Sequence, residues 1–325
     1  MRNAIDWWER HQIALYIGAI LIGAGVGLAL PALAHPFELA INPVLGVLLY
    51  STFLGVPLTR VGTAFRDIRF LGAVLLLNFV LIPIVVFALS RFVADNQALL
   101  VGVLFVLLTP CVDYVIVFAG LAGGAKERLL AATPLLMLVQ ILLLPLYLWL
   151  MAGPAVVEEF DVRPFVEAFL LLIVLPLTLA AITQLLARQS RAARGIQHGL
   201  LSAMVPLMML TLAVVVASQM SAVIGSLAQL LVVVPIFIAF VLLAAPLGAF
   251  AGRLGKLDVP SRRAVIFSGA TRNSLVVLPL ALALPTGFAI TPLVVVTQTL
   301  VELIAMVAMV GLVPRLNPHG PPHPD

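Results

Sequence analysis

The sequence holds one cysteine, Cys111, among its 325 residues. A single cysteine excludes disulfides within the chain and any metal site made only of cysteines. Charged side chains are scarce as well: they make up 10% of the chain, whereas 63% of the residues are hydrophobic and the mean hydropathy is +1.20. No soluble core needs so much apolar side chain. Repeated long apolar runs with so little charge predict an all-α polytopic membrane protein.

Ten apolar segments follow one another along the chain, and each is near the ~20 residues that a helix needs to cross a bilayer. The residues before the first segment are few and mixed in charge, and its apolar run ends at Pro31 without a small-residue cleavage site. We therefore expect no cleavable leader, and the first segment should stay as a span. The predicted spans are residues 12–32, 38–58, 69–91, 97–122, 128–151, 164–187, 197–218, 225–252, 262–284 and 289–313.

The basic residues alternate with these spans. If the N-terminus is cytoplasmic, fifteen of the eighteen lysine and arginine residues lie on the cytoplasmic side, two lie outside, and Arg272 lies within a span. This pattern follows the positive-inside rule and predicts a multi-pass protein of the cell membrane with both termini in the cytoplasm. The net charge of +4 is thus no signal for nucleic acid. The short loops hold no nucleophile–base set and no metal-ligand cluster, so we expect neither an enzyme nor a cofactor.

A short motif recurs along the chain. The tripeptide Thr-Pro-Leu occupies residues 133–135 and 291–293, and a glutamine follows at Gln140 and at Gln298. The common offset of 158 maps the fifth span onto the tenth, which cross the membrane in opposite directions. This relation predicts two inverted five-helix repeats, as in many secondary transporters. We expect a cytoplasmic N-terminus at 1–11, a first repeat at 12–151, an external linker at 152–163, a second repeat at 164–313 and a disordered cytoplasmic tail at 314–325.

Three ionisable side chains lie deep within predicted spans: Asp113, Arg272 and Glu302. A charge inside a bilayer is costly, so each one needs a reason. They pair with one another and lock helices together, or they line a path for substrate or protons; protonation can break a pair, so the two readings are compatible. We expect Asp113 and Glu302 to be the counter-ions of Arg272 and to couple transport to protons. Asn78 and Gln140 are lesser candidates, because an amide in a span more often bonds to a neighbouring helix.

The predicted fourth span is interrupted at Pro110. Proline removes a backbone N–H group and disfavours helix at Thr109 before it. Threonine is a favoured N-cap and proline a favoured first helical residue, so we expect a half-helix to begin at Pro110. Cys111 would then present a free backbone N–H group in its first turn. The thiol is either a ligand for the cargo or a small buried hydrophobic side chain, and both interpretations stay open.

The offset of 158 carries Pro110 to Ser268 and Cys111 to Gly269. We therefore expect the ninth span to break as well, within the polar stretch 268–274. Helices broken at corresponding places in two repeats are the best sequence indication of a transport site.

Four stretches share the pattern of one group of carriers. They are residues 75–83, Pro110-Cys111 with residues 115–118 and 121–124, residues 270–273, and residues 300–302. With these stretches the chain resembles the arsenical-resistance (arsenite efflux) branch of the bile acid:sodium symporter superfamily. The resemblance implies a ten-helix inverted repeat, a transport activity, and Cys111 as the arsenite-interacting residue. It also implies functional roles for Asn273 and Glu302.

The chain departs from that branch at several positions. Residues 118–119 are Phe-Ala where the branch usually has Trp-Asn, Leu275 stands where it has a glutamate, and Asp113 replaces a small apolar residue. The sodium-symporting branch uses a glutamate and a glutamine at positions that resemble Ser268 and Arg272. A fixed guanidinium would repel Na⁺, so we expect no sodium drive.

The sequence thus predicts a secondary carrier that exports arsenite, with antimonite as a second candidate, by proton antiport. The alternative is a proton- or sodium-coupled carrier of small organic anions, in which Arg272 and the half-helix N-termini hold a carboxylate. A channel or sensor on the same scaffold is a third class, which the broken helices disfavour. The predicted site residues are Cys111, Asn273 and Arg272 for substrate, Asp113 and Glu302 for protons, and Thr109, Pro110, Ser268 and Gly269 for the helix breaks.

Overall fold

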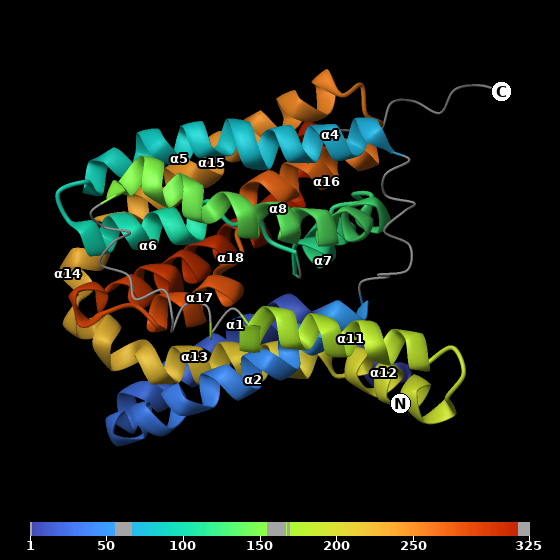
Figure 1. The fold of residues 1–325 in the computed structure, drawn as a ribbon, viewed down its shortest axis with the longest axis horizontal. Helices are drawn as coiled ribbons and strands as arrows, with labels where there is room; N and C mark the ends of the chain where they lie inside the picture. The colour runs from blue at the N-terminus through green and yellow to red at the C-terminus, as the bar shows by residue number, and fades with distance from the viewer. Residues whose placement is uncertain (1, 56–66, 113, 155–166, 168–169, 318–325) are drawn as a thin grey trace. The chain divides into compact units, whose positions relative to one another are not determined.

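All regular elements of the described part of the chain are helices, as expected from its composition. A computed structural model describes the chain apart from residues 1, 56–66, 113, 155–166, 168–169 and 318–325 (Figure 1). The α-helices are α1 (Arg2–Ala29), α2 (Ala34–Gly55), α4 (Ile68–Leu76), α5 (Ile82–Ser90), α6 (Gln97–Leu107), α7 (Tyr114–Leu121), α8 (Lys126–Ala152), α11 (Leu175–Leu186), α12 (Arg191–Ser202), α13 (Met204–Gly225), α14 (Leu227–Leu230), α15 (Val233–Leu254), α16 (Val259–Ala270), α17 (Ser274–Leu282) and α18 (Thr291–Leu316). Short 3-10 or π turns are η1 (Pro31–Leu33), η3 (Leu77–Leu81), η4 (Arg91–Val93), η5 (Leu170–Val174) and η6 (Thr286–Phe288).

Several of these helices can cross a membrane. Within the described residues, five helical stretches are long and apolar enough: Pro31–Gly55, Ile68–Val93, Leu135–Ala152, Leu227–Leu254 and Thr291–Leu316. A sixth results if α12 and the following Met204–Met220, which meet at an angle of 54°, are taken as one broken span. An integral multi-pass membrane protein is therefore confirmed. The count of ten spans and their inverted repeat stay predictions.

The chain forms two compact units, and each unit draws on both halves of the sequence. The first comprises Met1–Val56, Asp161–Leu230 and Leu278–Val296. In it α1 packs closely on α13, since a Cβ atom at Gly23 would lie 2.6 Å from the Ala213 carbonyl oxygen and one at Gly27 2.5 Å from that of Ala217. Small residues at such a seam let two membrane helices approach backbone to backbone.

The second unit comprises Pro57–Phe160, Leu231–Val277 and Thr297–Asp325. It contains α4 to α8, α15, α16 and most of α18, and all the predicted site residues belong to it. Gly248 in α15 faces the backbone of α16, where its Cβ would lie 2.7 Å from the Ile266 Cα atom. Helices α15 and α16 therefore form a tight pair (Figure 1).

The third predicted span contains a local irregularity. Between α4 and α5 the chain makes the π turn η3, in which the Ile82 N–H group donates to the Leu77 carbonyl. Single π turns inside α-helices occur often at functional sites. This one contains Asn78, whose side chain is fully buried.

Candidate transport site

Two broken helices meet in the second unit. One break lies between the end of α6 at Leu107 and the start of α7 at Tyr114, and the other between the end of α16 at Ala270 and the start of α17 at Ser274. Their extended backbones form an antiparallel bridge between Pro110 and Arg272. The bridge satisfies backbone groups that the missing helical turns would otherwise leave unpaired, a requirement in the apolar interior of a membrane protein.

The bridge contains two hydrogen bonds. Cys111 N donates to the Thr271 carbonyl at 3.3 Å, and Asn273 N donates to the Thr109 carbonyl at 2.8 Å. The predicted break of the fourth span is therefore present. The prediction of a free backbone N–H group at Cys111 is wrong, because this group donates a hydrogen bond to the Thr271 carbonyl.

The prediction that a half-helix begins at Pro110 is wrong. It lies in the bridge, and the Thr109 hydroxyl donates backward to the carbonyls of Phe105 (2.8 Å) and Val106 (3.1 Å) in α6. Thr109 therefore closes the helix before it. Proline fits the bridge because its fixed φ angle suits extended backbone and its missing N–H group is not needed there.

The second break lies a few residues later than the offset of 158 predicted. Ser268 and Gly269 still belong to α16, and the extended residues are 271–273. Thr271 ends this helix as Thr109 ends α6, with its hydroxyl donating to the Phe267 carbonyl at 2.7 Å. It also contacts the Met306 sulfur at 3.2 Å. The chain is thus interrupted within the stretch 268–274 as expected, but Ser268 and Gly269 are not the breaking residues.

Arg272 is fully buried between the two breaks, with 0% of its surface exposed. Its Nη2 donates to Asn78 Oδ1 (2.9 Å) and to the carbonyls of Ser268 (2.8 Å) and Gly269 (2.6 Å). Its Nη1 donates to the Leu107 carbonyl at 3.2 Å. The guanidinium thus binds the last carbonyl of α6 and two carbonyls from the last turn of α16.

Asn78 connects the π turn η3 to this site. Besides accepting from Arg272, its amide donates to Ser268 Oγ at 2.9 Å and to the Val74 carbonyl at 3.0 Å. From the sequence, Asn78 was only a lesser candidate for a residue of the transport site. Its position in the π turn, which the sequence does not reveal, directs the amide toward the crossing.

Glu302, in α18, reaches the crossing through the backbone. Its Oε2 accepts a hydrogen bond from the Arg272 N–H group at 2.8 Å and another from the Gln298 side-chain amide. The expected proximity of Glu302 to Arg272 is therefore present, with the contact made to the peptide group. Gln298 was not among the predicted site residues, although the repeated Thr-Pro-Leu…Gln motif indicated it.

Further polar side chains in and near the second break are also buried. Asn273 is 0% exposed, and its Oδ1 accepts from Val276 N at 3.3 Å, as a cap of α17 does. Within the described chain, Asn273 Nδ2, Ser274 Oγ and Gln298 Oε1 have no hydrogen-bond partner. Asp113, the other predicted proton-coupling residue, lies outside the described residues, as does the side chain of Leu275.

Cys111 lies directly beside the bridge. Its side chain is 0% exposed and forms no disulfide. Its backbone bond to Thr271 fixes the thiol next to the residue that precedes Arg272. The structure therefore brings Cys111, Arg272, Asn273 and Glu302 to one crossing.

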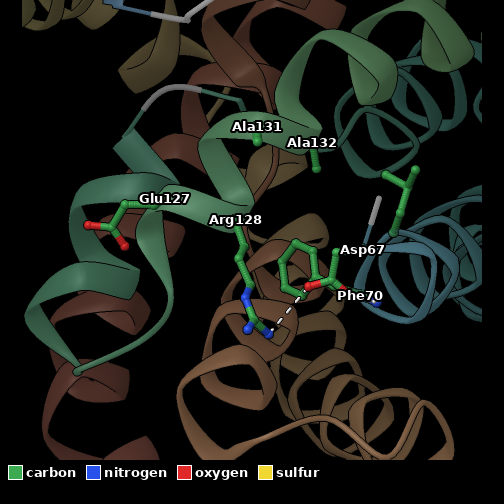
Figure 2. A pocket seen from close by; sticks show the side chains of 7 residues that line it. Asp67, Phe70, Glu127, Arg128, Ala131 and Ala132 are labelled. Atoms are coloured by element: carbon green, nitrogen blue, oxygen red, sulfur yellow. Dashed lines mark hydrogen bonds and ion pairs between the residues drawn. The ribbon is translucent and has the colours of Figure 1, made fainter. Parts of the chain in front are cut away.

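A pocket of about 280 Å³ lies elsewhere in the same unit (Figure 2). Figure 2 shows Arg128, near the start of α8, extended toward Asp67 at the start of α4. Arg128 Nη1 lies 3.4 Å from Asp67 Oδ2 and 3.2 Å from Asp258 Oδ1, and it donates to Ser261 Oγ at 2.6 Å. These contacts connect the starts of α4, α8 and α16. The charges are about half exposed, so each pair contributes at most ~1 kcal/mol. None of the predicted transport residues lines this pocket.

Comparison with known proteins identifies the family. The sequence model of the sodium bile acid symporter family matches residues 42–224. No curated protein matches the chain. The match covers more than half of the chain and includes the first break, and it ends before the second. A transporter family agrees with the buried crossing and with the apolar helices. The chain belongs to the sodium bile acid symporter family.

Proposed function

We propose that this protein exports trivalent arsenic from the cell as arsenite, with antimonite as a second cargo, by proton antiport across the cell membrane. The observation that carries the proposal is the position of Cys111, a fully buried thiol directly beside the bridge of two broken helices. Sulfur is a soft ligand that suits As(III). One thiol gives a site weak enough to release its load, whereas several would retain it.

The proposed architecture is ten spans in two inverted five-helix repeats, with both termini in the cytoplasm. The crossing supports it, because each broken helix ends in the same way. Thr109 and Thr271 each donate a hydroxyl hydrogen bond to the carbonyl four residues earlier. An inverted repeat would produce this pairing of like with like.

Proton coupling is assigned to Glu302 and Asp113. Glu302 is buried, and its carboxylate accepts from the peptide N–H of Arg272 at the centre of the second break. A change in its protonation would alter a hydrogen bond of the bridge itself. An ionisable side chain within a span is a functional-site hypothesis by default, and here its partner can be named.

Replacement of the thiol tests the proposal. Cys111→Ser should abolish arsenite resistance of cells that depend on this protein, while membrane-inserted protein stays at the wild-type level. Val106→Ala is the control, because Val106 is equally buried in α6 but has no thiol. Wild-type resistance from Cys111→Ser would overturn the role of the thiol.

The second candidate is a carrier of small organic anions, and the family match favours it. In that case Arg272 would hold a carboxylate. The guanidinium already donates to four oxygen atoms of the protein, which weakens this reading. Uptake of a panel of carboxylates into everted membrane vesicles, measured beside arsenite, separates the two candidates.

A further inference from the structure

Helix α12 has two chemically distinct faces. One face holds exposed basic side chains three or four residues apart, namely Arg191, Arg194 and His198. The opposite face holds apolar side chains at the same spacing, namely Ala193, Ile196 and Leu200. Residues three and four apart are neighbours on a helix, so each set forms one face. A basic face opposite an apolar face is typical of helices that lie in the surface of a membrane.

The structure sets α12 at an angle to the helix that follows it. Helix α12 begins after Ser190, whose Oγ accepts from Ala193 N at 3.4 Å, and it meets α13 at 54°. The side-chain amides of Gln184 and Gln197 both donate to the Leu54 carbonyl, at 3.3 and 3.4 Å, so that α11 and α12 are held against the end of α2 (Figure 1). If α13 runs along the bilayer normal, α12 lies closer to the membrane plane than to the normal.

Three arginines at this corner of the first unit have no acidic partner. Arg188 lies in the turn before α12 and is exposed, like Arg191 and Arg194. The sequence contains no aspartate or glutamate between Glu167 and Asp258, and none of the three arginines forms an ion pair with residues that the structure describes. Apolar side chains near them in the sequence are more than half exposed, namely Leu185, Leu186 and Ile196. Unpaired guanidinium groups beside exposed apolar side chains match a bilayer surface, which offers phosphate groups and acyl chains together.

We propose that α12 is an interfacial helix and that Arg188, Arg191 and Arg194 bind the phosphate headgroups of anionic phospholipids. A free phosphate ion offers the same charge, but it leaves Ile196 and the leucines of α11 in water, whereas a phospholipid covers them with its acyl chains. The topology proposed above places this surface at the cytoplasmic leaflet. The lipid binding itself involves no cargo, so its failure would not touch the arsenite proposal.

A simpler role for these arginines is topological. Basic residues in cytoplasmic loops fix the orientation of the spans, and such charges attract anionic lipid according to their number alone. Three basic residues of the second unit allow a comparison: Arg69 in the first turn of α4, Arg253 in the last turn of α15, and Lys256 just after α15. All three are exposed. The reference variant Arg69→Gln/Arg253→Gln/Lys256→Gln therefore removes as much charge as a triple variant at α12 but leaves α12 intact.

Native mass spectrometry of the purified full-length protein tests the proposal, with phosphatidylglycerol or phosphatidylcholine of identical acyl chains titrated in detergent. Wild-type protein should bind phosphatidylglycerol more tightly than phosphatidylcholine. The variants Arg188→Gln, Arg191→Gln and Arg194→Gln should each raise the Kd for phosphatidylglycerol about fivefold, and the triple variant should lose the preference. The reference variant should keep it. Because all the replaced side chains are exposed, thermal melting in phosphatidylcholine micelles should match that of the wild type, which serves as the folding control.

Three outcomes would overturn the proposal. Equal losses of the lipid preference in the α12 triple variant and the reference variant would show that binding follows net charge alone. Displacement of phosphatidylglycerol by inorganic phosphate at the same concentration would show that a free anion is the ligand. A wild-type protein without any preference for phosphatidylglycerol would leave no headgroup site. If the α12 triple variant does not fold, the single variants decide, because wild-type affinity in all three would contradict the role of the arginines.

Discussion

The two helix breaks share a backbone device but differ in chemistry. Each helix ends with a threonine that bonds back to its own last turns, Thr109 in α6 and Thr271 in α16. The first break then presents a thiol, Cys111, and the second presents a guanidinium, Arg272, held by neutral oxygens. One backbone arrangement can therefore hold a thiol at one break and a fixed charge at the other.

The difference also bears on the tasks of the two breaks. A buried charge is costly unless hydrogen bonds surround it, so the second break must be rigid and well packed. Asn78 accepts from the Arg272 guanidinium, Glu302 accepts from the Arg272 peptide N–H group, and Gln298 donates to Glu302. The sequence of the first break holds two side chains that can ionise, Cys111 and Asp113. In the function proposed above, the first break carries the thiol for the cargo, and the coupling residues belong to both breaks, Asp113 to the first and Glu302 to the second.

Among the variants that test the roles of the two breaks, we expect the largest effect on transport from a substitution of Glu302. Glu302→Gln keeps an oxygen that can accept from the Arg272 N–H group, so stability should fall by only about 1 kcal/mol, the difference between a charge-assisted and a neutral hydrogen bond. The variant cannot exchange a proton, so arsenite uptake into everted vesicles should lose its dependence on the pH gradient. Retained dependence would exclude Glu302 as the coupling group and leave Asp113.

A smaller effect, on stability, tests whether the two threonines end their helices in an equivalent way. Thr109→Val and Thr271→Val each remove a hydroxyl that bonds to the carbonyl four residues earlier, at 2.8 Å and 2.7 Å. Each change should therefore cost about 1 kcal/mol. Chemical denaturation or thermal melting of the two variants in detergent measures this cost. A loss at one position only would break the proposed equivalence and count against the inverted repeat.

The sequence predicted the membrane class and both broken helices for identifiable reasons. Long apolar runs reveal spans, and Pro110 and the polar stretch 268–274 reveal interruptions. Within the stretch 268–274 it placed the break at Ser268 and Gly269, a few residues too early, because the offset came from the predicted fifth and tenth spans. Leu107 lies 26 residues before Thr133, whereas Ala270 lies 21 residues before Thr291. The offset therefore does not hold across a connection of different length.

The contacts at the crossing could not be predicted in the same way. The sequence brought Arg272 and Glu302 together as a pair of charges, but their contact uses the peptide N–H of Arg272. Which atom of a residue faces a neighbour depends on the bend of the chain at the break. The bridge between Pro110 and Arg272 likewise joins segments 162 residues apart, and no local pattern marks it.

Arsenite flux into everted membrane vesicles tests the central claim most directly. Vesicles with wild-type protein and an acid interior should accumulate arsenite, a protonophore should abolish the accumulation, and replacement of Na⁺ by choline should leave it unchanged. Vesicles with Cys111→Ser should accumulate none. The account would be contradicted if arsenite failed to accumulate while a carboxylate entered with an imposed sodium gradient.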